Sequence, residues 1–359
     1  MFVYTADTAL ILGAGFSKCA GIPLQGEFSG TILSDSFNTP ADLTITKALK
    51  EFLASAFYWT EGSPLPSLED IFTMIDLSAG SGHNLGRKLT PKLLRAIRRM
   101  LIYRVFSILD QRFDPSKEIS ALLQSFIPAK KPITTHFVVL NWDIVLERHL
   151  QFYDSNIGID YCVQALEWSG EDRHELRRVG IAKVHGSSNW VYCDNCKSVF
   201  YDRYRKLSLS IHAGLIKADF RLFDESVTDR RFSQIVGISA KERNCRLCQA
   251  SVGPHIATFS FKKSFRTHAF ASSWLAAEKI LTDAKRWIFI GYSLPDADYE
   301  FKHLLKTTHL KYAKGTKPQK VIEVVLLDDT PAEGRYRTFF GQNSVVVTQA
   351  GLADYVARL

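Results

Sequence analysis

The sequence contains no run of about 18 apolar residues, and this lack excludes a helix that spans a membrane. Its start, MFVYTADTALIL, has no basic lead and no small-residue cleavage site, so it does not resemble a signal peptide. No internal repeat, low-complexity stretch or linker interrupts the chain. The 359 residues, 46% apolar and 23% charged, are typical of a globular protein with one large or two ordinary domains. We therefore expect a soluble cytoplasmic protein that makes no contact with a membrane.

Cysteines are few, and four of the six fall in two C-x-x-C pairs. In a cytosolic chain such pairs are metal ligands more often than disulfides. Four thiolates would close a tetrahedral zinc site and leave no position for water, which predicts a structural metal. The alternative is four cysteines in an apolar core. The segment between the pairs is longer than a plain zinc ribbon needs, so we expect it to hold an extra hairpin or helix. The predicted ligands are Cys193, Cys196, Cys245 and Cys248.

The formal net charge is +8, which either attracts phosphates and nucleic acid or simply keeps the protein soluble. One predicted helix, from about Pro91 to Leu109, has an apolar side and a basic side. Its basic residues are Lys92, Arg95, Arg98 and Arg99. A basic helix face is usually exposed to solvent, and its alternative role is to bind nucleic acid or a partner protein.

The chain is organised around a stretch near its start, TALILGAGFSKCAGIP, residues 8–23. An apolar strand ends at Leu12, glycines follow at once, and a helix begins near Ser17. Open α/β sheets hold dinucleotides in this way, because glycines let backbone N–H groups approach a pyrophosphate. An ordinary connection between a strand and a helix is the alternative. The second break at Ala20-Gly21-Ile22-Pro23 makes this helix too short to cross over to a neighbouring strand.

Polar residues follow two further apolar strands. Asn141 and Asp143 come directly after the strand at 136–140, and His185 follows the strand at 181–184. The carboxyl ends of parallel strands are where open α/β sheets build their sites. For Asn141 and Asp143 the alternative is that they cap the next helix, and for His185 it is a structural role.

A second turn with a glycine follows the strand at 286–290 and contains Gly291 and Ser293. It could receive a phosphate or the adenosine ribose. The strand at 321–327 ends in Asp328-Asp329, which could accept hydrogen bonds from ribose hydroxyls or cap the next turn. Between the first two strands, residues 24–130 look like a helical insertion.

Taken together and in this order, the motifs of the chain resemble the sirtuin family. They are GAG-x-S-x-x-AGIP, V-L-N-W-D, H-G, the two cysteine pairs and I-G-Y-S-L-P-D-A-D. The last motif resembles the bacterial sirtuin-like branch, whose NAD hydrolases deplete NAD during phage infection. The sequence departs from protein-deacylating sirtuins at Leu24-Gln25-Gly26 and at 257–263, in elements that serve the peptide substrate. The resemblance implies an α/β fold: a Rossmann-like parallel sheet with a helical insertion (24–130) and a small zinc-binding module (188–253). Residues 1–187 and 254–359 would form the NAD-binding domain.

The resemblance also implies a function, namely cleavage of the nicotinamide–ribose bond of NAD in antiphage defence. Asn141 and His185 would be catalytic, with His185 as general base, and Asp143 would orient the nicotinamide. The remaining NAD-binding residues would be Gly13, Ala14, Gly15, Ser17, Gly291, Ser293 and Asp328. The alternatives are NAD-dependent protein deacylation or ADP-ribosylation, a non-catalytic sensor of NAD or ADP-ribose, and a nucleic-acid-binding subunit. We expect a homo-oligomer or a defence-operon partner such as a ring-forming ATPase, because NAD hydrolysis must be silent until triggered.

Overall fold

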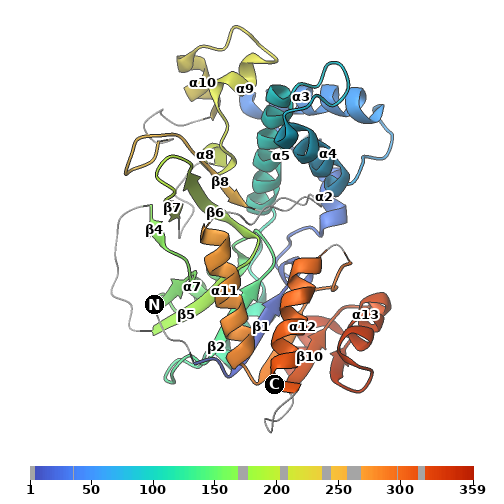
Figure 1. Ribbon diagram of the computed structural model, residues 1–359, viewed down its shortest axis with the longest axis vertical. Helices are drawn as coiled ribbons and strands as arrows, with labels where there is room; N and C mark the ends of the chain where they lie inside the picture. The colour runs from blue at the N-terminus through green and yellow to red at the C-terminus, as the bar shows by residue number, and fades with distance from the viewer. Residues whose placement is uncertain are drawn as a thin grey trace.

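The computed structural model describes residues 5–34, 36–168, 177–202, 209–236, 244–256, 268–296, 298–313 and 320–359 (Figure 1). The stretch at 257–263, where the sequence departs from deacylating sirtuins, lies outside the described residues.

A seven-stranded sheet forms the centre of the lower part of the molecule in Figure 1. Its strands are β1 (Thr8–Leu12), β2 (Thr135–Val139), β3 (Ile157–Asp160), β5 (Arg177–Lys183), β9 (Arg286–Ile290), β10 (Val321–Val325) and β11 (Val345–Thr348). The order across the sheet is β11-β10-β9-β1-β2-β5-β3, and every neighbouring pair is parallel. The predicted α/β fold with a Rossmann-like parallel sheet is therefore confirmed.

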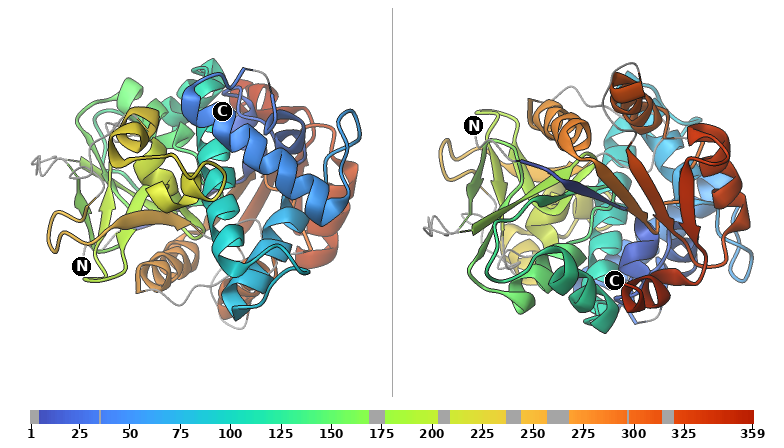
Figure 2. Two further views of the ribbon diagram at one scale, coloured as in Figure 1. Left: turned by 90° about the horizontal axis from the view of Figure 1, so that it is seen from above. Right: turned by 90° about the horizontal axis from the view of Figure 1, so that it is seen from below.

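Both faces of this sheet are buried, which explains why its central strands are apolar throughout. Successive residues of β1 alternate between two cores: Leu10 and Leu12 pack in one, and Ala9 and Ile11 in the other. The second core lies under α11 (His268–Asp283), α12 (Tyr299–Ala313) and α13 (Thr330–Phe340). The first lies under the insertion helices, α7 (Val145–Tyr153) and α14 (Gly351–Ala357). The right-hand view of Figure 2 shows the sheet between these two layers.

The chain between β1 and β2 is helical, as the sequence predicts. Its helices are α1 (Ala14–Lys18), α2 (Gln25–Thr31), α3 (Pro40–Phe57), α4 (Leu68–Ser81), α5 (Pro91–Gln111) and α6 (Lys117–Phe126). A hydroxyl side chain accepts a hydrogen bond from a first-turn amide of each of the four longest helices between β1 and β2. These caps are Thr39, Ser67, Thr90 and Ser116. The helix after β1 is short, as expected, but it begins at Ala14 and ends at Lys18 instead of beginning near Ser17.

The prediction that the basic side of the helix at 91–109 faces solvent is right for Lys92 and Arg95, which are exposed, and wrong for Arg98 and Arg99. Arg98 of α5 donates to Asp76 on α4 at 2.8 Å. Arg99 donates through its Nε to Asp219 at 2.8 Å, and Asp219 is almost fully buried. These arginines therefore tie α5 to neighbouring helices instead of forming a surface for nucleic acid or a partner.

A smaller sheet holds the cysteine pairs. Its strands are β4 (Ala165–Glu167), β6 (Gly186–Cys193), β7 (Val199–Tyr201) and β8 (Val252–Ile256), in the order β4-β7-β6-β8. Between the cysteine pairs lie α8 (Leu209–Ala213), α9 (Lys217–Arg221) and α10 (Asp229–Val236), so the expectation of an extra helix there is confirmed. The domain limits given above stay a prediction.

In the described part of the chain, no helix is both long enough and apolar enough to cross a membrane.

Candidate functional site

The order of the strands reverses beside β1. From β1 the sheet continues through β2 and β5 on one side and through β9 and β10 on the other. In open α/β sheets, ligands bind at the carboxyl ends of the strands beside such a reversal. The predicted site residues follow these strand ends: Asn141 and Asp143 after β2, His185 after β5, and Gly291 after β9.

The turns after β1 and β9 are bonded to each other through their backbones. Gly13 N donates to Ile290 O at 3.0 Å, and Gly15 N donates to Gly291 O at 2.8 Å. A Cβ added to Gly13 would lie 2.5 Å from Gly291 O, and one added to Gly291 would lie 2.2 Å from Phe16 N. The glycines thus serve first to let two protein backbones meet. The sequence predicts an approach to a pyrophosphate or an ordinary connection between a strand and a helix, and it does not reveal this contact.

Three predicted residues form one hydrogen-bonded cluster at the turn after β1. The Nδ2 group of Asn141 donates to Gly13 O at 2.8 Å and to Ser17 Oγ at 3.0 Å. The Ser17 hydroxyl in turn donates to Asp143 Oδ2 at 2.8 Å. The other oxygen of Asp143 accepts from Val145 N at 3.0 Å, at the start of α7. Asp143 therefore combines the two roles that the sequence left open, because it both supports a helix start and joins the cluster.

A buried ion pair that the sequence analysis missed lies behind this cluster. Lys183 and Glu147 are 0% and 2% exposed, and their Nζ and Oε1 atoms are 3.0 Å apart. Lys183 also donates to the backbone carbonyl of Asp143, and so fixes the chain at that residue. The Tyr161 hydroxyl donates to the same oxygen of Glu147 at 3.2 Å, and burial raises the pKa of Tyr161 well above its usual value. The sequence feature that could have indicated this buried pair is the lysine within the apolar strand at 181–184.

His185 follows β5 and is held from two sides. Its Nδ1 lies 3.1 Å from Leu140 O, and because a carbonyl can only accept, Nδ1 carries a hydrogen. Its Nε2 lies 3.5 Å from Asp298 Oδ1. The other oxygen of Asp298 accepts from the Tyr292 hydroxyl at 3.0 Å, and burial raises the pKa of Tyr292 well above its usual value.

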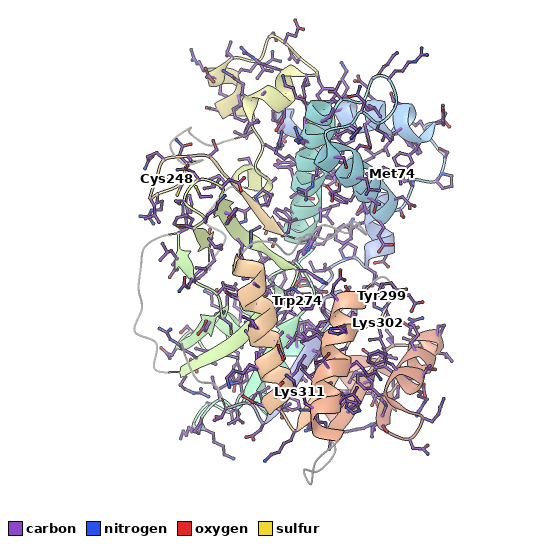
Figure 3. The ribbon with its side chains drawn as sticks, viewed as in Figure 1. Met74, Cys248, Trp274, Tyr299, Lys302 and Lys311 are labelled. Atoms are coloured by element: carbon purple, nitrogen blue, oxygen red, sulfur yellow. The ribbon has the colours of Figure 1, made fainter. Side chains whose placement is uncertain are left out.

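Asp298 is a second residue that the sequence analysis missed, although the motif I-G-Y-S-L-P-D-A-D ends in it. A carboxylate facing Nε2 stabilises the imidazolium that forms when His185 accepts a proton. Trp274 lies beside the histidine: its ring centroid is 6.5 Å from that of His185, and its indole N–H donates to Val184 O at 3.0 Å. Figure 3 shows Trp274 on α11, at the level where this helix approaches the smaller sheet.

The other predicted NAD-binding residues lie at the same edge of the sheet with different exposure. Ala14 is exposed at the start of α1, and Ser293, half-buried, follows β9. Asp328 is exposed beyond β10 and has a left-handed φ of 49°. The neighbouring Asp329 caps α13 by accepting from Ala332 N at 2.9 Å. Of the two aspartates, Asp328 is therefore the one left accessible to a ligand.

The two C-x-x-C pairs come together at the edge of the smaller sheet, near the position of Cys248 in Figure 3. The sulfurs of Cys193 and Cys248 are 3.4 Å apart, those of Cys196 and Cys245 are 3.6 Å apart, and all four lie within 4.8 Å of one another. A tetrahedral zinc with bonds of about 2.3 Å needs sulfurs about 3.8 Å apart, so the cluster fits zinc.

The backbone of the two pairs is also alike. The residue after each pair, Lys197 or Gln249, has a left-handed φ of 63° or 64°. Its amide donates to the carbonyl of the first cysteine of the pair at 2.9 Å in both cases. Two matching turns that aim four thiols at one point are what a structural zinc site requires, and they argue against four unrelated core cysteines.

No protein-family model and no curated protein matches the sequence. Among solved structures, the chain is similar to a Sir2–p53 peptide–NAD⁺ complex, with 14% identity over 98% of this chain and 90% of that one and a TM-score of 0.41. It is also similar to Sir2 bound to an acetylated peptide, with 13% identity over 98% and 90% of the two chains and a TM-score of 0.40. The function proposed below rests on this chain's own residues.

Proposed function

We propose that the chain is an NAD hydrolase that cleaves the bond between nicotinamide and ribose. The observation that carries the proposal is the cluster of Ser17, Asn141 and Asp143 at the turn after β1. His185 follows β5 and its carboxylate partner Asp298 follows β9, at the same edge of the sheet with β1 and β2 between the two strands. Hydrogen-bonding groups for a ribose and a base with a charge partner thus follow strands at the edge of the sheet where such folds bind dinucleotides, which supports the proposal.

In the proposed reaction the C1′–N bond breaks and its electron pair leaves with nicotinamide. Water supplies the oxygen that bonds to C1′, and its proton passes to Nε2 of His185, directly or through a ribose hydroxyl. The Nδ1–H bond to Leu140 O holds the ring in the tautomer that leaves Nε2 basic, and Asp298 stabilises the resulting cation. The products are nicotinamide and ADP-ribose.

The remaining residues of the cluster would position the substrate. Asn141 would hold the ribose or the attacking water, and Asp143 would hold the nicotinamide carboxamide. The turn of Gly13, Ala14, Gly15 and Ser17 would receive the pyrophosphate, and Gly291, Ser293 and Asp328 the adenosine end. The four-cysteine cluster would hold a zinc ion that stabilises the smaller sheet and takes no part in the reaction.

Protein deacylation and ADP-ribosylation are the competing reactions. The sequence supports hydrolysis over deacylation because Leu24-Gln25-Gly26 replaces the residues that follow G-I-P in deacylating sirtuins. In the structure Leu24 precedes α2, and its amide donates to Glu27 at 2.7 Å. Leu24-Gln25-Gly26 therefore forms the start of α2.

The test is to incubate the purified protein with NAD and to quantify nicotinamide and ADP-ribose by chromatography, with and without an acetylated peptide. Asn141→Ala and His185→Ala should each abolish nicotinamide release while the melting temperature stays near that of the parent. Asn156→Ala and His83→Ala are matched controls, because both side chains are exposed and lie outside the cluster. Equal turnover by His185→Ala and the parent would remove His185 from the mechanism, and peptide-dependent release would favour deacylation.

We further propose that NAD depletion serves antiviral defence and is switched on by assembly, as a homo-oligomer or with a partner such as a ring-forming ATPase. The helices between the cysteine pairs offer a surface for this contact, since Ile216 and Leu222 are exposed there. Turnover per chain should then rise with protein concentration, in parallel with molecular mass by light scattering. Turnover that is maximal in a monomer would contradict assembly-dependent activation.

A further inference from the structure

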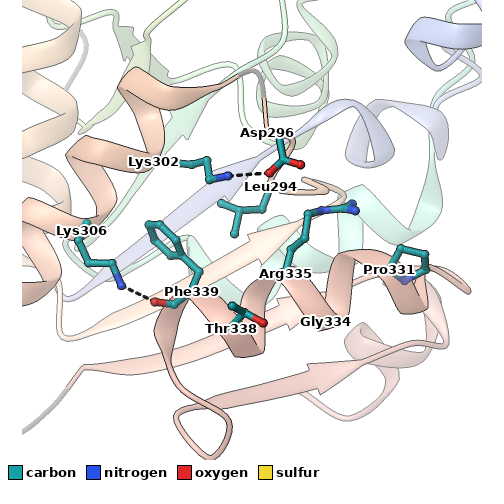
Figure 4. Close-up of a pocket in the computed structure, with 9 residues that line it drawn as sticks. All are labelled: Leu294, Asp296, Lys302, Lys306, Pro331, Gly334, Arg335, Thr338 and Phe339. Carbon is teal, nitrogen blue, oxygen red and sulfur yellow. Dashed lines mark hydrogen bonds and ion pairs between the residues drawn. The ribbon is translucent and has the colours of Figure 1, made fainter.

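A cavity of about 500 Å³ lies between α12 and α13 (Figure 4). It is on the face of the sheet that α11–α13 cover, and its lining does not include Asn141, Asp143 or His185. The lining residues that matter chemically are Leu294, Asp296, Lys302, Lys306, Arg335 and Phe339. The cavity has the volume of an ordinary small-molecule site.

The charges around this cavity are unbalanced. Lys302 is neutralised by Asp296, whose Oδ1 lies 3.0 Å from its Nζ. Arg335 donates through Nε to Ser293 O at 2.8 Å, which leaves its two Nη groups directed elsewhere. Lys306 donates to the carbonyl of Phe339. Within the described ranges, neither Arg335 nor Lys306 has a carboxylate partner, so the cavity has an excess of positive charge.

Lys306 in particular is in a setting that favours an added anion. Its Nζ lies 4.1 Å from the ring centroid of Phe339, so part of its surroundings is aromatic. Burial lowers the pKa of Lys306, because a cation loses solvation there without gaining a counter-charge. An anion in the cavity would restore that missing stabilisation.

We propose that this cavity binds a phosphate-bearing small molecule of about nucleotide size. Its phosphate would lie against Arg335, because the guanidinium offers two parallel N–H donors, while Lys306, at the other end of the lining in Figure 4, would add positive charge. Its uncharged part would lie against Phe339 and Leu294, the apolar side chains of the lining. None of the residues proposed to bind NAD lines this cavity, although one of them, Ser293, accepts a hydrogen bond from Arg335.

The same helix that supplies Arg335 also holds the loop beyond β9. Arg335 donates to Ser293 O, and the next residue, Tyr336, donates through its hydroxyl to Tyr292 O at 2.9 Å. Tyr292 in turn bonds Asp298. A ligand that engages Arg335 therefore acts on a residue that anchors this loop.

The test is calorimetric titration of the full-length protein with ADP, and in parallel with adenosine, which lacks phosphate. ADP should bind and adenosine should not. Arg335→Met should weaken ADP binding by about tenfold or more, as expected for a lost hydrogen bond to a charged group, and Lys306→Met should weaken it less, because Lys306 contributes charge alone. Arg337→Met is the matched control, since Arg337 is on the same helix but pairs with Glu333 outside the cavity lining.

A second pair of variants separates charge from folding. Thr338 is an exposed lining residue, and Thr338→Glu and Thr338→Gln add side chains of nearly equal size. Only Thr338→Glu should weaken ADP binding, because it adds a like charge. Equal affinity of Thr338→Glu and Thr338→Gln, or no ADP binding at millimolar concentration, would overturn the proposal. Binding that Ser17→Ala removes but Arg335→Met leaves intact would also overturn it, because ADP would then be at the turn after β1.

Discussion

Replacing Gly291 by alanine should separate the two turns on which the candidate site is built. Gly291 has a φ of 61°, and an added Cβ would lie 2.2 Å from Phe16 N and 2.3 Å from the carbonyl carbon of Gly15. A left-handed alanine costs about 1 to 2 kcal/mol. Because the turns must move apart, the bonds from Gly13 and Gly15 to the β9 turn would be lost as well, at about 1 kcal/mol each. The free energy of unfolding should therefore fall by about 3 to 4 kcal/mol.

The assay is denaturant unfolding followed by circular dichroism, with Gly30→Ala as the matched control. Gly30 is in α2, and a Cβ there would meet nothing within 4 Å. The control should be stabilised by about 0.5 to 1 kcal/mol, because alanine is a better helix former than glycine. If Gly291→Ala unfolded at the same denaturant concentration as the parent, the backbone contact between the turns would not contribute to the free energy of unfolding as argued.

Further predictions concern the buried pair, the metal and pH. Lys183→Met should lower the free energy of unfolding by about 3 to 5 kcal/mol, because Glu147 is left buried without a partner. The double variant Lys183→Met/Glu147→Gln should recover much of this loss in the same unfolding assay. No recovery would speak against the pairing. The purified protein should contain about one zinc ion per chain by elemental analysis, and Cys248→Ser should lose both metal and thermal stability; a metal-free parent with normal melting would refute this. Burial lowers the pKa of His136 and His255 to about 4, so both stay neutral in the folded state above that pH. The free energy of unfolding should therefore be at its full value above pH 6.5. It should fall towards pH 4 by up to about 1.4 kcal/mol per pH unit for each histidine. Chemical unfolding at several pH values measures that slope, and a flat profile between pH 6.5 and 4 would contradict it.

Much of the parallel sheet could be predicted because its strands are short apolar runs that end in glycine or polar residues. The strand at 286–290 and the end of β1 at Leu12 are predicted to the residue. The grouping of Asn141 with Ser17 could be expected once both are placed at the carboxyl ends of adjacent strands. These features depend on local sequence and on one rule about where such sheets bind ligands.

The features that the sequence did not predict depend on residues far apart in the chain. Asp298 reaches His185 only because the loop after β9 folds back toward the end of β5. Arg99 was expected in solvent because its partner, Asp219, lies 120 residues away in a separate segment. A helix face with four basic residues cannot by itself reveal whether carboxylates from elsewhere cover it.

The most direct test of the central claim is the release of nicotinamide from NAD by the purified full-length protein, without peptide, over a wide range of protein concentrations. The account predicts equal amounts of nicotinamide and ADP-ribose, with turnover per chain rising with concentration and absent in His185→Ala. The absence of nicotinamide at every concentration, or its release only when an acetylated peptide is present, would contradict the account.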